Sequence, residues 1–132
     1  MFDLKTRVLI VDDMLTMRKL VGKVCKEIGF TDLTEAADGA IAWEAIANAN
    51  PPIGLVISDW NMPNTSGLDL LKRVRGDARH GKLPFVLVTA EAEQHQIVEA
   101  IKAGVSNYVV KPFTSEGLKA KLEAVHQKMT GG

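Results

Sequence analysis

Residues 8–13 read Val-Leu-Ile-Val-Asp-Asp, and this stretch indicates how the rest of the chain is built. Its first four residues form a continuous apolar run, which is typical of a strand buried on both faces of a parallel sheet. The apolar residues that follow recur at the spacing of one helix face, and Gly29 is expected to end that helix. They are Met17, Leu20, Val21, Val24, Cys25 and Ile28.

The same alternation of strand and helix continues to the end of the chain. Further strands are expected over residues 33–36, a weak edge strand, and over 55–57, 85–88 and 108–110. Asp38 is expected to cap the second helix, and Ser66 with Asp69 resembles a capping box for the third. The fourth helix carries Ile97, Val98 and Ile101, and the fifth carries Leu118, Leu122, Val125 and Met129. Five such alternations predict an α/β fold, a parallel sheet with helices on both faces.

Length and composition limit the class of protein. A chain of 132 residues, 46% of them hydrophobic, has the size and composition of one globular domain. Its net charge of zero argues against nucleic-acid binding through bulk electrostatics, and its single cysteine excludes an internal disulfide. The longest apolar runs are too short to span a membrane, and no signal peptide is visible. We therefore expect a soluble cytoplasmic domain, 1–132, with no membrane or nucleic-acid partner.

Polar residues follow four of the five predicted strands. Asp12 and Asp13 follow the first strand, Asp59 the third, Thr89 ends the fourth, and Lys111 follows the fifth. Taken singly, the acids are ordinary capping or turn residues, the threonine an ordinary strand residue and the lysine a solvated surface residue. Ligands of such sheets bind beyond the carboxyl ends of the strands, so the convergence of all five at that edge favours a functional site.

The charges of this cluster point to a chemistry. Two carboxylates about 5 Å apart repel by roughly 3 kcal/mol at an effective dielectric constant near 20, so three acids need a counter-charge. Lys111 supplies one positive charge, and hard oxygen ligands favour Mg²⁺ over zinc for the remainder. A carboxylate nucleophile, Mg²⁺, a hydroxyl and an amine are the components of phosphoryl transfer.

At these residues the sequence resembles the receiver domains of two-component response regulators. The resemblance covers almost the whole chain and is carried by Asp12-Asp13, Asp59, Thr89 and Lys111-Pro112. Residues 11–18, 59–64, 89–92 and 108–113 resemble in particular the single-domain chemotaxis regulators. The resemblance implies a flavodoxin-like (βα)5 three-layer sandwich with strand order 2-1-3-4-5.

The resemblance also implies roles at the acidic cluster. Asp59 would accept a phosphoryl group from a histidine kinase of the CheA type. Asp13, Asp59 and the backbone carbonyl of Asn61 would bind Mg²⁺ directly, and Asp12 would act mainly through a coordinated water. The chain would not be an enzyme in the usual sense, because it would catalyse only its own phosphorylation and dephosphorylation.

A switch is implied on the other side of the site. Thr89 and Lys111 would hold phosphoryl oxygens, and the Lys111-Pro112 bond would be cis. Tyr108 would turn inward when Thr89 moves toward the phosphoryl group, which would alter the surface of the fourth helix, fifth strand and fifth helix.

The expected output is chemotaxis signalling by a monomer at the flagellar motor. We expect no output domain after the fifth helix, so signalling would pass to a partner such as the flagellar motor switch protein. Glu93-Gln94-His95 stands where such regulators carry basic residues, and Met14-Leu15 replaces the usual aromatic–serine pair beside the metal site. Binding to the motor or to a phosphatase is therefore open, and a phosphorelay shuttle or a regulator of a non-flagellar partner is the alternative.

Two other classes share this architecture. A flavodoxin-type electron carrier needs a Ser/Thr/Gly-rich loop after the first strand, but the acids there would repel the phosphate of FMN. A phosphatase of the haloacid dehalogenase type needs a second Asp two residues after the nucleophile, and Asn61 occupies that position. We expect the remaining candidate groups to be structural: Cys25 packed, and His80, His95, His126 and the basic cluster Lys72-Arg73, Arg75 and Arg79 solvated.

Overall fold

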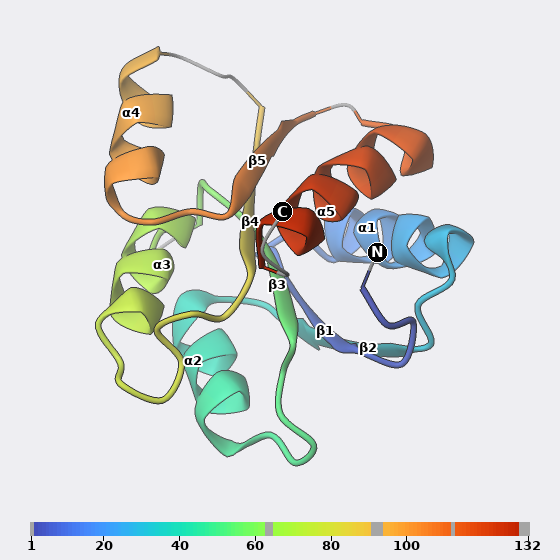
Figure 1. Cartoon of the computed structure of the whole chain (residues 1–132), viewed down its shortest axis with the longest axis horizontal. Coiled ribbons are helices and arrows are strands. Elements are labelled where there is room, and N and C mark those ends of the chain that lie inside the picture. The colour runs from blue at the N-terminus through green and yellow to red at the C-terminus, as the bar shows by residue number, and fades with distance from the viewer. Residues whose placement is uncertain (1, 63–64, 91–93, 112, 130–132) are drawn as a thin grey trace.

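The computed structural model of the chain describes residues 2–62, 65–90, 94–111 and 113–129. Within them, five strands alternate with five helices (Figure 1). In chain order they are β1 Arg7–Val11, α1 Leu15–Ile28, β2 Asp32–Ala36, α2 Gly39–Asn48, β3 Leu55–Asp59, α3 Gly67–Arg75, β4 Phe85–Thr89, α4 Gln94–Lys102, β5 Asn107–Val110 and α5 Ser115–Met129. None of these helices is both long and apolar enough to cross a membrane.

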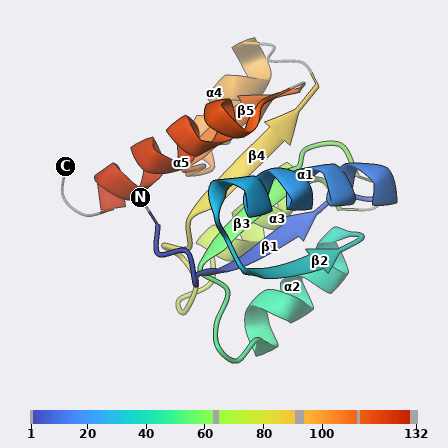
Figure 2. The ribbon, with the colours of Figure 1, turned by 90° about the vertical axis from the view of Figure 1, so that its right-hand side faces the viewer.

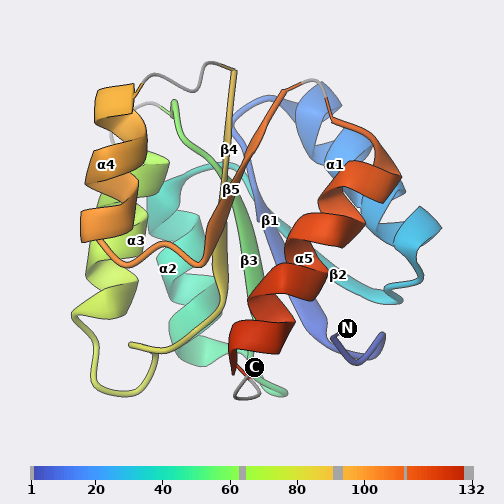
Figure 3. The same cartoon turned by 45° about the horizontal axis from the view of Figure 1, so that its top comes forward.

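The strands form one parallel sheet in the order β2-β1-β3-β4-β5. Helices α1 and α5 cover one face, and α2, α3 and α4 cover the other (Figures 2 and 3). This three-layer arrangement and strand order confirm the predicted α/β fold. Because all the strands are parallel, their carboxyl ends share one edge of the sheet, at the top of Figure 3.

The alternation of side chains along β1 divides the core into two layers. Leu9 and Val11 point toward the α2–α4 side, and Val8 and Ile10 toward the α1–α5 side. All four are at most 1% exposed, as expected for a strand covered on both faces. Strand β3 is buried along its whole length, which places its last residue, Asp59, in a desolvated position.

The predicted helix boundaries are set by local chemistry. Gly29 ends α1 with φ 124°, a conformation that favours glycine. The Asp38 side chain accepts a hydrogen bond from the Ile41 amide at 2.8 Å and begins α2. Ser66 and Asp69 form the expected capping box at the start of α3. These boundaries fix where each strand–helix connection, and therefore each site residue, lies.

Some expectations about helix faces are wrong. Leu20, Val98 and Ile101 were assigned to apolar faces but are 48%, 42% and 62% exposed. Among the α4 residues whose burial the structure describes, Ala100 is the one that is buried, so Val98 and Ile101 lie on parts of the helix that the rest of the domain leaves uncovered. Leu20 lines an open hollow together with Met17, Lys111 and Phe113, which leaves about half of it exposed.

The basic cluster on α3 is not a uniformly solvated face. Arg75 is half-buried, and its guanidinium donates to the carbonyls of Gly104 at 2.7 Å and Leu83 at 2.6 Å. It also donates to Ser106 Oγ at 3.3 Å. Arg75 therefore joins α3 to the segments that precede β4 and β5, a role that its position in a run of basic residues did not indicate.

Two histidines are also less exposed than predicted. His126 is half-buried, with its ring centroid 5.2 Å from that of Phe2. His80 is half-buried with its ring edge-on to Trp43, at 6.3 Å between centroids. His95 is exposed, as expected. Aromatic contacts, which depend on tertiary neighbours, account for the burial of the first two.

Candidate functional site

The carboxyl edge of the sheet gathers the polar residues that the sequence placed after the strands. Asp12 follows β1 and is 2% exposed, Asp59 ends β3 at 8%, and Thr89 ends β4 at 5%. Asp13 is exposed beside Asp12. Acidic side chains are almost never buried without a partner, so the burial of two of them at one edge is itself evidence for a specific site.

Asp12 is held by its own neighbours. Its amide donates to the Ala36 carbonyl at 3.2 Å, which extends the pairing between the first two strands by one residue. Its Oδ1 accepts a hydrogen bond from the Met14 amide at 2.9 Å. This turn at the end of β1 leaves Oδ2 directed toward the other polar groups, as its proximity to Lys111 shows.

Lys111, which follows the edge strand β5, brings a positive charge to the acids. Its ammonium lies 3.2 Å from Asp59 Oδ1 and 3.6 Å from Asp12 Oδ2. Its backbone amide donates to the Thr89 carbonyl at 2.8 Å, which ties the end of β5 to the end of β4. Strand pairing and the ammonium thus place Lys111 between two buried carboxylates.

The three acids form a cluster suited to a hard cation. One carboxylate oxygen from each of Asp12, Asp13 and Asp59 lies within 4.8 Å of the other two. At that separation two ionised carboxylates repel by about 3.5 kcal/mol at an effective dielectric constant of 20. Oxygen ligands in such a cluster fit Mg²⁺ better than a softer metal.

The same cluster shifts the ionisation of Asp59. Burial raises the pKa of Asp59 above its ordinary value of 3.8, and the charge of Asp12 raises this pKa further. Lys111 opposes both effects through its charge and its hydrogen bond. A cation bound to the cluster would act in the same direction as Lys111 and favour the ionised, nucleophilic form of Asp59.

Gly67 lets the start of α3 lie directly against Asp59. The Gly67 amide donates to the Trp60 carbonyl at 2.9 Å, which closes the connection after β3. A Cβ at this position would overlap the backbone oxygen of Asp59 and lie 2.9 Å from Leu87 Cδ2. A residue with a side chain would therefore have to displace the Asp59 backbone.

Most of the predicted site residues are brought together. Asp12, Asp13, Asp59 and Lys111 form the charged cluster, with Thr89 at the end of the strand between Asp59 and Lys111. Asn61 is exposed, two residues after Asp59. The cis bond expected at Lys111-Pro112 lies outside the described residues, as do Pro63-Asn64 and residues 91–93.

Tyr108 lies apart from the acids. It is half-buried on β5 opposite Leu87, and the Lys121 ammonium is 5.1 Å from its ring centroid. Tyr108 lines a hollow together with other residues of β5, of α5 and of the segment between them. Two residues that contact the site backbone, Gly67 and Arg18, were not predicted. The sequence pattern does not show how closely the start of a helix approaches the end of the strand before it.

The family model for the response regulator receiver domain matches residues 8–123. This chain belongs to the receiver domain family. The receiver domain is 45% identical over 125 residues to the chemotaxis protein CheY of Pseudomonas aeruginosa, covering 95% of this chain and 99% of that protein. It is 44% identical over 119 residues to CheY1 of Helicobacter pylori, covering 90% of this chain and 95% of that one.

Solved structures agree with the sequence comparison. The structure of chemotaxis protein CheY4 from Vibrio cholerae matches this receiver domain with a TM-score of 0.83 and 30% identity, covering 92% of this chain and 98% of that chain. The receiver domain is thus closely related to CheY chemotaxis regulators in sequence and in fold.

Proposed function

We propose that this receiver domain accepts a phosphoryl group on Asp59 and signals in that state. The observation that carries the proposal is the buried Asp59 carboxylate held 3.2 Å from the Lys111 ammonium and beside Asp12. An Asp59 oxygen attacks the phosphorus of a phosphohistidine, a P–O bond forms, and the P–N bond to histidine breaks. Lys111 and Thr89 stand where they can balance charge and hydrogen-bond the transferred oxygens.

Mg²⁺ is the cation that this proposal requires. Asp13, Asp59 and the carbonyl of Asn61 would hold it directly, with Asp12 acting through a water. When bound, Mg²⁺ neutralises negative charge on the phosphoryl group and on the acids. Asp12 and Asp13 place carboxylate oxygens close to that of Asp59, and Lys111 favours the ionised form of Asp59.

We assign the domain to chemotaxis signalling because its relatives in Pseudomonas aeruginosa and Helicobacter pylori are chemotaxis proteins. In this proposal a CheA-type histidine kinase phosphorylates the domain in the cytoplasm, and a phosphatase returns it to rest. The domain acts as a monomer and not as an enzyme on other substrates. Its output is the α4–β5–α5 surface, offered to a flagellar motor switch protein.

The phosphorylation proposal is tested by intact mass after incubation with acetyl phosphate and Mg²⁺. We expect one added phosphoryl group on the wild type and none on Asp59→Asn. Asp32→Asn, which removes a β2 carboxylate at the opposite end of the sheet, is the matched control and should be labelled normally. Labelling of the Asp59 variant equal to that of the wild type would contradict the assignment.

The alternative functions predict different results. A phosphorelay shuttle would pass its phosphoryl group to a histidine phosphotransfer domain, which a motor regulator would not do efficiently. A flavodoxin would purify with flavin absorbance, and a phosphatase would turn over p-nitrophenyl phosphate. A colourless protein with neither transfer nor turnover would favour the chemotaxis role.

A further inference from the structure

Arg18, on the first turn of α1, connects the acid site to the edge of the sheet. Its Nη1 donates to the backbone carbonyl of Asp12 at 2.8 Å. Its Nε donates to Glu35 Oε1 on β2 at 3.2 Å, and its side chain is only 15% exposed. One guanidinium therefore bridges the main chain of a site residue and a carboxylate on another strand.

The geometry of the sheet explains why Asp12 needs this donor. Val11 is paired with Ala36, so Asp12 lies opposite the next residue, and its amide already donates to the Ala36 carbonyl. In a continued parallel ladder the Asp12 carbonyl would accept from the amide two residues beyond Ala36. That residue is Asp38, where the chain has already left β2 and turns into α2. Arg18 supplies a donor at the position where the strand pairing ends.

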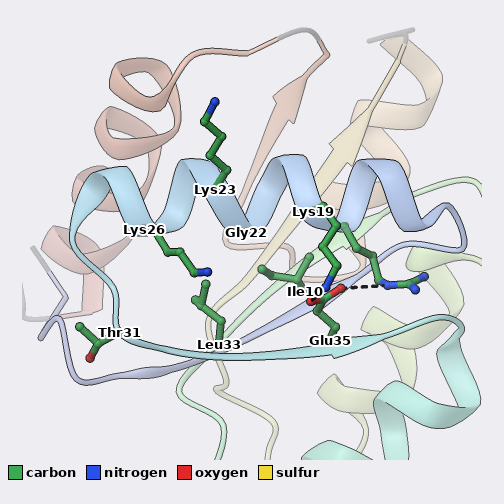
Figure 4. Close-up of a pocket in the computed structure, with 9 residues that line it drawn as sticks. Ile10, Lys19, Gly22, Lys23, Lys26, Thr31, Leu33 and Glu35 are labelled. Carbon is green, nitrogen blue, oxygen red and sulfur yellow. Dashed lines mark hydrogen bonds and ion pairs between the residues drawn. The ribbon is translucent and has the colours of Figure 1, made fainter.

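Glu35 holds the guanidinium in place. Its second oxygen, Oε2, accepts from the Lys19 ammonium at 2.9 Å. Figure 4 shows Lys19 reaching from α1 to Glu35, at one end of a groove whose floor includes Ile10 and Leu33. The Lys19 hydrogen bond lowers the pKa of Glu35, so the carboxylate that anchors Arg18 stays ionised at neutral pH. A bridging guanidinium, with its fixed planar fork, is suited to fixing orientation as well as charge.

We propose that Arg18, anchored by Glu35, is a positioning residue that fixes the Asp12 main chain and thereby the orientation of the Asp12 and Asp13 carboxylates. Neither Arg18 nor Glu35 is among the groups that would contact the cation or the phosphoryl group. Arg18 acts on them through Asp12, as outer partners orient the ligands of a metal site. The metal part of this inference rests on the proposed function, and its backbone part does not.

The chain contains a matched control for this arrangement. Arg7 donates Nε to Asp32 on β2 at 3.0 Å and Nη1 to the Pro51 carbonyl at 3.0 Å. It thus bridges a β2 carboxylate and a main-chain carbonyl, as Arg18 does, but at the amino-terminal end of the strands, away from the acids. Arg18→Met and Arg7→Met remove the same type of bridge, and only the first lies near the acids.

The first measurement needs no metal. The Met14 amide donates to Asp12 Oδ1, so its hydrogen exchange reports whether the turn that carries the acids is ordered. With chelator present, we expect Arg18→Met to lose protection at this amide, after correction for global stability. Arg7→Met should keep the protection of the Met14 amide. Arg18→Lys retains a donor but not the planar guanidinium, so its protection should lie between those of Arg18→Met and the wild type. Unchanged protection in Arg18→Met would overturn the proposal.

The second measurement is a Mg²⁺ titration followed by the fluorescence of Trp60, which adjoins Asp59. Trp43→Phe is introduced into the parent and into every variant, so that the fluorescence comes from Trp60 alone. We expect Arg18→Met to bind Mg²⁺ about tenfold more weakly than the parent, the lower end for loss of an outer partner. Arg7→Met should bind as the parent does. Equal weakening in both variants would overturn the positioning role, because it would show a general loss of stability.

The two measurements separate the proposals. If the parent protein itself fails to bind Mg²⁺, the proposed metal function is wrong, and the exchange at Met14 still decides the role of Arg18. If the parent binds Mg²⁺ and Arg18→Met binds equally well, the positioning role is wrong and the metal function stands.

Discussion

The Lys111 ammonium lies 3.2 Å from Asp59 Oδ1, although the two residues are 52 positions apart in sequence. Their strands are not neighbours, since β4 lies between β3 and β5. The lysine side chain crosses the end of β4 to reach the acid, and Thr89 ends that intervening strand. This relationship makes Asp59 a buried carboxylate whose ionisation depends on the balance between one cation and its acidic neighbours.

The first prediction concerns pH and the stability of the metal-free protein. Because burial and Asp12 raise the pKa of Asp59 above 3.8, the native state binds this proton more tightly than the unfolded chain does. Stability from the protonated group is present at low pH and is lost as pH rises through the native pKa. We therefore expect Asp59→Asn to raise the urea midpoint at pH 7 in the presence of chelator.

The pH dependence provides the control. The advantage of Asp59→Asn should shrink as pH is lowered through the native pKa of Asp59, because the wild-type carboxyl is then increasingly protonated in the native state. The charges that face Asp59 are Asp12, Asp13 and Lys111, and all are retained in the variant. A lower midpoint at pH 7 would show that Lys111 outweighs burial at this position. A gain that is independent of pH would show that the ionisation of Asp59 is not its cause.

The second prediction compares two helical glycines. Gly67→Ala should destabilise the domain by about 1–3 kcal/mol, as overpacking does, because its Cβ would overlap the Asp59 carbonyl. Gly22→Ala is the matched control, since its Cβ would meet only Ile10 Cδ1 at an ordinary 3.8 Å. It should stabilise the domain by about 0.5–1 kcal/mol through helix propensity. Urea unfolding followed by circular dichroism measures both, and equal effects would refute the close approach.

The third prediction concerns the structural arginine of α3. Arg75→Met should lower the free energy of unfolding by about 2 kcal/mol, because it leaves carbonyls at Leu83 and Gly104 without this donor. Arg73→Met removes only a cation–π contact with Trp43, 4.5 Å from the ring centroid, and should cost less than about 1 kcal/mol. Similar losses from both, measured by urea denaturation, would count against the role assigned to Arg75.

The fourth prediction concerns the proposed switch. A phosphoryl group brings about two negative charges, which Thr89 can partly satisfy by moving, and Tyr108 can then fill the space vacated. Thr89→Ala should still bind beryllofluoride, a phosphoryl mimic, at Asp59. It should lose the shifts that the mimic induces in the Tyr108 ring and α4 amides in NMR spectra. The same shifts in wild type and variant would reject this coupling.

The fifth prediction concerns the thiol. Cys25 is fully buried on α1, and burial raises its pKa to about 12. The native protein should therefore not react with iodoacetamide at pH 8, and modification should follow the unfolded fraction as urea is added. Stoichiometric alkylation without denaturant, detected by intact mass, would show that α1 opens locally.

The residue pattern predicted a parallel α/β fold and placed the acids, the threonine and the lysine at one edge of the sheet, and the resemblance to receiver domains supplied the strand order. A run such as Val8–Val11 is typical of a strand covered on both sides. The capping residues Asp38 and Ser66 act on neighbours three positions away. Because these signals are local, they identify the elements correctly. The acids, threonine and lysine followed from one rule, that the carboxyl ends of parallel strands meet at a shared edge.

Other features depended on the tertiary structure. Arg18 and Glu35 are 17 residues apart and meet only because β2 pairs with β1 under α1, and Arg75 meets Leu83 and Gly104 only where three segments converge. The exposure of Leu20 and Ile101 also depended on tertiary packing, because the surrounding elements leave these two side chains partly uncovered. Such contacts leave no periodic signal in the sequence. The sequence specified which residues stand at the ends of the strands, and the packing of the layers decided which other residues hold them there.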